Sequence, residues 1–147
     1  MTDKVEYSIF TWGPCVAKMK MTDKFYEALM KEAEASKTEE QLYQDRLAGI
    51  IKKEYQLKDY NKVQPYISDI VRIYDHIWDK WRNVEKPSTN QYLIKALWVN
   101  YMGPGEFNPP HDHSDDLSFI AYLRIPAELK NINFLTFCFT ASGFMKR

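Results

Sequence analysis

The chain has 147 residues, in which 20 lysines and arginines balance 20 aspartates and glutamates. A chain of this length suits a single domain covering residues 1–147. Because the formal net charge is zero, we expect neither nucleic acid nor a membrane surface as a partner, since both attract basic proteins. No apolar run of about 18 residues is present, and the first residues lack the basic and apolar regions of a signal peptide. We therefore expect a cytoplasmic protein.

The first third of the chain predicts two short strands and then a helix. The segment 6–12 is rich in aromatic and β-branched residues and ends before Gly13-Pro14, which favours a break in the chain. The segment 16–21 is a second candidate strand. Thr22 then precedes a run of good helix formers, so it is the predicted N-cap of a helix over residues 23–36.

The middle of the chain contains one clear helical pattern. Residues 41–57 give mixed signals, because Gly49 interrupts their apolar residues, and we expect part helix and part loop there. From residue 63 to residue 81 the apolar residues recur every three or four positions, which predicts an amphipathic helix.

The rest of the chain predicts strands, over residues 91–101, 117–125 and 132–140. Together these segments indicate an α+β fold. Its N-terminal half, residues 1–86, is expected to be helical, and its C-terminal half, residues 87–147, to be rich in strands.

Two of the three histidines lie two residues apart, in a segment between two predicted strands. On an extended backbone His111 and His113 point to the same side, so their imidazoles can converge on one metal ion. Pro109 and Pro110 stiffen the backbone in front of them. Imidazole and carboxylate suit Fe(II), Mn(II) or Zn(II). The alternative is a pair of surface histidines that bind nothing.

Several neighbouring residues are further candidates. Asp115 forms an H-x-D triplet with His113, the start of a set of two histidines and one carboxylate, and the alternative is a solvated turn. Asn100 and Tyr122 lie in the flanking strands and are candidates for a cofactor pocket, although a role in the core is the alternative. A strand asparagine needs polar partners, which favours a site beside Asn100. Motifs for nucleotide binding and serine hydrolysis are absent from the sequence.

The order of three segments resembles a known family. These segments are Trp98-Val-Asn100, Gly105 to His113, and Leu117 to Pro126. They are similar to the small 2-oxoglutarate/Fe(II) oxygenases common in marine phages and bacteria, whose pattern reads W-x-N, a glycine-containing loop, N-x-x-H-x-H, and a strand that ends Y-L-x-x-P. The resemblance covers residues 90–126.

The resemblance implies a double-stranded β-helix, or jelly-roll, with N-terminal helices packed against one face. It implies Fe(II) bound by His111, His113 and a later histidine, and 2-oxoglutarate that is converted to succinate and carbon dioxide while a substrate is hydroxylated. We place Asn100 and Tyr122 at the cofactor and keep Asp115 as an alternative third metal ligand. A phage-encoded member would act in the host cytoplasm.

The chain departs from the family pattern after His113. No histidine follows, and the later arginines are Arg124 and Arg147. We therefore expect a C-terminally truncated relative with an incomplete jelly-roll, which binds metal weakly and turns over 2-oxoglutarate poorly or not at all. Its unclosed sheet could associate with a second copy through an edge strand. Two alternatives stay open: a non-catalytic β-sandwich binding or interaction module, and a cupin-like metal protein that does not use 2-oxoglutarate. The sequence does not identify the substrate.

Overall fold

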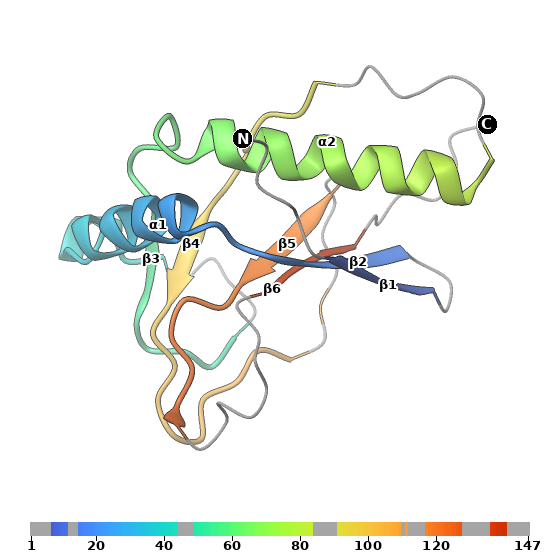
Figure 1. Ribbon diagram of the computed structural model, residues 1–147. Coiled ribbons are helices and arrows are strands. Elements are labelled where there is room, and N and C mark those ends of the chain that lie inside the picture. The colour runs from blue at the N-terminus through green and yellow to red at the C-terminus, as the bar shows by residue number, and fades with distance from the viewer. Residues whose placement is uncertain are drawn as a thin grey trace. The chain divides into compact units, whose positions relative to one another are not determined.

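The computed structural model describes residues 7–11, 15–43, 49–83, 91–109, 111, 117–127 and 136–140. These residues form helices and antiparallel strands, which confirms the predicted α+β class (Figure 1). They divide into two compact units, and neither unit is continuous in the sequence. Unit 1 takes its residues from Met1–Tyr26, Ile73–Ser88 and Asp112–Arg147, and unit 2 from Glu27–Arg72 and Thr89–His111.

Unit 1 contains an antiparallel sheet with the strand order β1-β2-β6-β5. Its strands are β1 (Tyr7–Thr11), β2 (Cys15–Lys20), β5 (Ser118–Ala121) and β6 (Thr136–Thr140). Strands were predicted in each of these regions, and β5 is shorter than expected. Residues 132–135 of the last predicted strand lie outside the described residues. The buried apolar residues of the unit come from β2, from the start of α1 and from the second half of α2: Val16, Ala17, Met19, Met21, Phe25, Tyr74 and Ile77.

Unit 2 contains most of helix α1 (Asp23–Ala35), the 3-10 helix η1 (Glu39–Gln41) and the first half of helix α2 (Gln64–Trp81). It also contains the antiparallel pair of β3 (Glu54–Gln56) and β4 (Trp98–Asn100), in which Glu54 lies opposite Asn100. The buried apolar residues of the unit are Leu29, Ala33, Ile51, Tyr55, Leu57, Val63, Ile67 and Val71.

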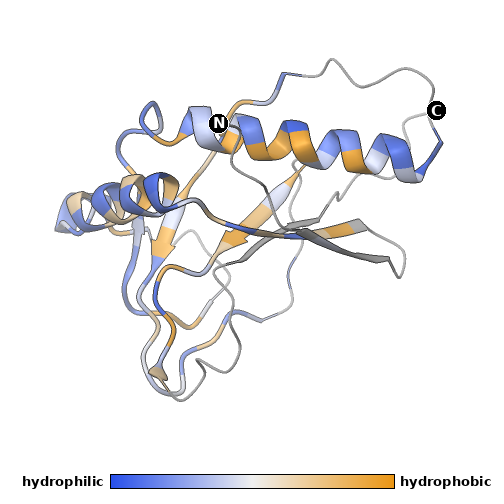
Figure 2. Ribbon diagram, in the orientation of Figure 1, coloured by the Kyte–Doolittle hydropathy of each residue, from blue (hydrophilic) through white to orange (hydrophobic). Residues whose placement is uncertain are grey.

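Local sequence signals explain where both helices begin and end. The hydroxyl oxygen of Thr22 accepts a hydrogen bond from the backbone N–H of Phe25 at 3.3 Å, which confirms the predicted N-cap of α1. Pro65 lies in the first turn of α2, where its missing N–H costs nothing. Asn83, just after α2, has a φ of 56°, the left-handed conformation that commonly ends a helix. The hydrophobic residues of α2 gather along one side of the helix, as its sequence pattern predicted (Figure 2).

The structure differs from the sequence prediction in two regions. Residues 41–57, expected to be part helix and part loop, contribute the strand β3. The strand predicted over 91–101 is reduced to β4, because the residues before it bond to a side chain of α2. The Gln64 side chain accepts a hydrogen bond from the N–H of Ile94 and donates one to the carbonyl of Tyr92. Of the described strands that precede residue 86, β1 and β2 were predicted and β3 was not.

Among the described residues, no helix is both long and apolar enough to cross a membrane.

Candidate functional site

His111 lies in unit 2, on an exposed stretch of irregular backbone that follows β4. Its ring nitrogen Nδ1 is 2.8 Å from the carbonyl oxygen of Pro109. Because a carbonyl oxygen accepts hydrogen bonds and cannot donate them, Nδ1 carries the proton in this contact. In a neutral imidazole the other ring nitrogen, Nε2, then carries the lone pair. A metal-binding histidine is commonly oriented in this way, by donation from its second nitrogen to a backbone carbonyl.

Of the other predicted site residues, Asn100 and Tyr122 belong to the described part of the chain. His113 and Asp115 lie outside the described residues, so their placement is not part of the structure. Tyr122 follows β5 in unit 1, and 45% of its surface is exposed. Among the described residues, no group of three or more histidines, cysteines, aspartates and glutamates is arranged to hold a metal ion.

Asn100, the third predicted residue that is described, ends β4 and lies opposite Glu54 of β3. Opposite residues of an antiparallel pair project to the same face of the sheet, with their Cβ atoms roughly 5 Å apart. Glu54 is completely buried, with 0% of its surface exposed. Both of its carboxylate oxygens and Oδ1 of Asn100 are buried and make no hydrogen bond with any described residue. Three acceptor atoms thus lie close together without a donor.

The surroundings of Glu54 disfavour its charged form. Burial raises the pKa of the Glu54 carboxyl above its ordinary value of 4.5, and the negative charge of Glu106 raises it further. The pKa of Glu106 is shifted in the opposite direction. The N–H of Gly103 is the main cause of that lowering, and the N–H and the charge of Lys52 add to it.

Glu106 fastens the loop between β4 and His111 to the residues before β3. One of its carboxylate oxygens accepts a hydrogen bond from the N–H of Gly103 at 2.8 Å, and the other accepts one from the N–H of Lys52 at 3.3 Å. Next to it the N–H of Ile50 donates to the carbonyl of Phe107 at 3.0 Å. A Cβ at Gly49 would collide with the side chain of Asn108. The chain that leads to His111 is therefore held against residues 49–53.

Tyr101 anchors the other side of β4. Side chains alternate between the two faces of a strand, so Tyr101 points away from the face that carries Asn100. Its hydroxyl donates to the carbonyl of Ala33 in α1 at 3.3 Å, and its ring meets the edge of Tyr55 with a centroid separation of 5.9 Å. The Lys37 ammonium lies 4.4 Å from the centre of the same ring. These contacts join β4 to α1 and fix the strand that carries Asn100.

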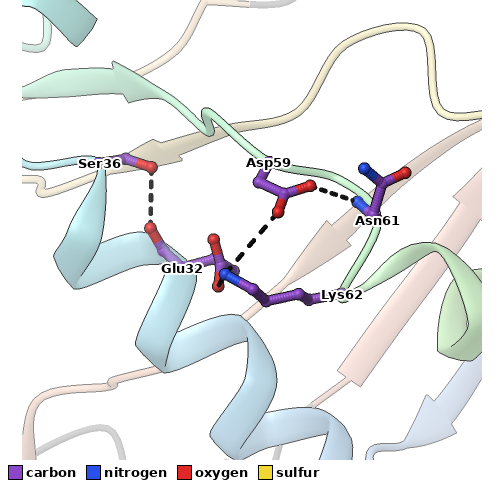
Figure 3. Close-up of polar contacts among 5 residues, drawn as sticks. All are labelled: Glu32, Ser36, Asp59, Asn61 and Lys62. Atoms are coloured by element: carbon purple, nitrogen blue, oxygen red, sulfur yellow. Dashed lines mark hydrogen bonds and ion pairs between the residues drawn. The ribbon is translucent and has the colours of Figure 1, made fainter.

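Glu32 of α1 is also buried, with 4% of its surface exposed, but it has partners (Figure 3). The ammonium of Lys62 lies 2.9 Å from its carboxylate, and 3.7 Å from that of Asp59. The Ser36 hydroxyl donates to the backbone carbonyl of Glu32 at 2.8 Å. The main cause of a raised pKa at Lys62 is its hydrogen bond to Glu32.

Sequence reasoning missed both Glu54 and Glu106. Glu54 follows Lys52 and Lys53, and such a run of charges is typical of a solvated loop. The one local hint is the placement of Glu54 and Gln56 at alternate positions with Tyr55 and Leu57, a pattern that fits a short strand. Burial of Glu54 depends on pairing with β4, which a local pattern does not encode.

Comparisons with protein-family models, with curated proteins and with solved structures found no match for this chain.

Proposed function

We propose that the chain is a 2-oxoglutarate/Fe(II)-dependent dioxygenase of the hydroxylase type, on an incomplete jelly-roll. His111 and His113 are the proposed metal ligands, and Asp115 is the candidate for a third. Asn100 and Tyr122 are the proposed contacts of the keto acid. When bound, Fe(II) and 2-oxoglutarate would supply the activation of dioxygen: 2-oxoglutarate would lose carbon dioxide and take up one oxygen atom to become succinate, and the other oxygen atom would be added to the substrate.

The observation that carries this proposal is the hydrogen bond between Nδ1 of His111 and the carbonyl of Pro109. It selects the tautomer in which Nε2 carries the lone pair, the form in which an imidazole binds a metal. The hydrogen bonds of Glu106 also support His111 as a ligand, because they fix the loop that leads to His111. The donors also fit the metal, since imidazole and carboxylate suit Fe(II) and leave coordination positions for other ligands.

Calorimetric titration with Mn(II), a redox-stable substitute for Fe(II), tests the metal site. We expect one binding event per chain, lost or weakened at least tenfold in His111→Ala and in His113→Ala. His76→Ala is the matched control, because His76 is an exposed histidine on α2. The variant Asp115→Asn removes a charge at nearly constant volume, so it weakens binding if Asp115 is a ligand. Unchanged affinity in the double variant of His111 and His113 would exclude the site.

Activity is tested with Fe(II), ascorbate, dioxygen and 2-oxoglutarate, by measuring succinate. Enzymes commonly turn over about once per second or faster. Formation of succinate at a much lower rate still supports the proposal, provided that the His111→Ala variant forms none. Metal binding through both histidines without succinate would contradict the dioxygenase and favour a metal-binding module without catalysis.

A further inference from the structure

We propose that Glu54 is kept as a neutral carboxylic acid, which donates its proton to Oδ1 of Asn100 and so joins β3 to β4 through their side chains. The inference does not depend on the proposed dioxygenase activity. It rests on the register of the two strands, on the burial of Glu54, and on three acceptor atoms that lack a donor.

The proton is assigned to Glu54 from the hydrogen-bond donors and acceptors of the Glu54 and Asn100 side chains. A carboxylate can only accept hydrogen bonds, and so can the carbonyl oxygen of an amide. An ionised Glu54 would therefore place a buried charge beside Oδ1 of Asn100, and none of these three oxygens accepts a hydrogen bond from a described residue. Burying a charge without a partner is far more costly than adding a proton to it. One proton on Glu54 removes the charge and supplies a donor for Oδ1 of Asn100.

The charged groups around Glu54 do not stabilise an anion there. The loop after β4 contributes Glu106, whose negative charge opposes ionisation of Glu54. Lys52 and Lys53 precede β3, but both are exposed and neither is paired with Glu54 among the described contacts. Tyr43, on the other side of β3, donates its backbone N–H to the Glu54 backbone carbonyl at 2.9 Å, which leaves the carboxyl group unsatisfied.

The proposed bond also fixes the amide of Asn100. With Oδ1 directed at Glu54, the NH₂ group of the amide faces away from β3 and is presented as a donor. Loss of the Glu54 proton would remove this constraint and place a charge between the strands. The pair thus makes the β3–β4 contact sensitive to pH.

The sign of the pH dependence follows from the direction of the pKa shift. The pKa of Glu54 is higher in the folded chain than its ordinary value of 4.5. The stabilisation from its proton is complete below 4.5 and is lost as the pH rises through the folded-state pKa. At a pH above both values, each unit of difference in pKa lowers the folding constant about tenfold.

The test is denaturant unfolding of the full chain between about pH 5 and pH 8, for the wild type, Glu54→Gln and Glu40→Gln. Glutamine keeps a donor for Asn100 and cannot ionise. We expect the folding constant of the wild type to fall with rising pH relative to that of Glu54→Gln, which becomes the more stable protein at the alkaline end. Glu40, an exposed residue of η1, is the matched control, and its variant should follow the wild type.

The inference would be overturned if the folding constant of Glu54→Gln changed with pH in parallel with that of the wild type and were lower throughout. That result would show that Glu54 is ionised and paired in the wild type. If Glu54→Gln does not fold, the wild type itself gives the answer. In a chain labelled with ¹³C at the glutamate side-chain carboxyls, one carboxyl should ionise at a higher pH than all the others. Ionisation of all of them over the same pH range would reject the assignment.

Discussion

The two buried glutamates of unit 2 are held in opposite ways. In the α1 corner, formed by α1 and residues 59–62, Glu32 faces the ammonium of Lys62 at 2.9 Å, and that side chain remains 57% exposed (Figure 3). In the strand pair of β3 and β4, Glu54 is more deeply buried and its oxygens make no hydrogen bond with a described residue. The two residues thus differ in the donor that reaches them: an ammonium group lies beside the Glu32 carboxylate, and no described donor bonds to that of Glu54.

The difference follows from the elements that carry the two residues. Glu32 lies on a helix beside a turn, where a long flexible lysine can reach it while its charge stays in water. Glu54 lies on a strand, and its neighbour across the pair is fixed by the register as Asn100. A short amide with its carbonyl oxygen buried offers no charge to neutralise the carboxylate. The following variants test whether this contrast holds.

The largest effect is expected for the apolar packing of the α1 corner. Leu29→Ala should lower the free energy of unfolding by about 2–5 kcal/mol, because it leaves a cavity beneath α1. Leu29 is 4% exposed. The exposed neighbour Glu27 provides the control, and Glu27→Ala should change stability by less than about 0.5 kcal/mol. Urea unfolding measures both. A smaller loss in Leu29→Ala than in Glu32→Gln would mean that the ion pair, and not apolar burial, holds α1.

The next effect concerns the charge of Glu32. Glu32→Gln should lower the free energy of unfolding by about 1 kcal/mol near pH 7, less than for a fully buried pair because Lys62 is half in solvent. The pKa of Lys62 is raised above 10.5, mainly by its bond to Glu32, so this contribution is present below 10.5 and is lost as the pH rises through the folded-state value.

Wild type and Glu32→Gln should therefore converge in strongly alkaline solution, as followed by unfolding midpoints. Glu54→Gln should behave differently, because it is expected to become more stable than the wild type as the pH rises. If both glutamine variants responded to pH in the same sense, the distinction between the two buried glutamates would fail.

The smallest effect is expected at Glu106. Backbone N–H groups, that of Gly103 first, lower the pKa of its carboxyl below 4.5, so its contribution is present above that pH and is lost as the pH falls. Glu106→Gln should therefore be slightly less stable than the wild type near pH 7 and equal to it near pH 2. The same variant removes a charge that raises the pKa of Glu54, so the alkaline loss of stability should become smaller. An unchanged alkaline profile would show that Glu106 does not act on Glu54.

The sequence predicted those elements whose signals are local. The helix α2 follows from apolar residues at three- and four-residue spacing, and the start of α1 from Thr22. The strand β3 was missed because Gly49 interrupts the apolar residues of its region, and because pairing with β4 brings together residues more than forty positions apart. The composition of residues 91–97 predicts a strand. The Gln64 side chain, however, bonds to backbone groups of Tyr92 and Ile94 that would otherwise bond to a neighbouring strand.

The candidate site stays a prediction, although the structure describes some of its residues. The sequence indicated an asparagine with polar needs at residue 100, and the structure places its carbonyl oxygen in a buried position beside Glu54. His111 was expected on a stiffened leader, and it lies on irregular backbone after a loop bonded through Glu106. The roles of His113 and Asp115 remain predictions. Glu54 itself was unpredictable, because a glutamate after two lysines carries no local sign of complete burial.

The order of strands in unit 1 has a consequence during synthesis of the chain. One edge of β2 pairs with β6, where Val16 lies opposite Thr140, and the other edge of β2 pairs with β1 (Figure 1). A ribosome that adds roughly 5–20 residues per second makes β6 on the order of ten seconds after β2. During that interval one hydrogen-bonding edge of β2 has no partner within the sheet, and unpaired edges attract strands of other chains. The growing chain is therefore at greatest risk of mispairing before β6 emerges, and a slower ribosome would lengthen that period.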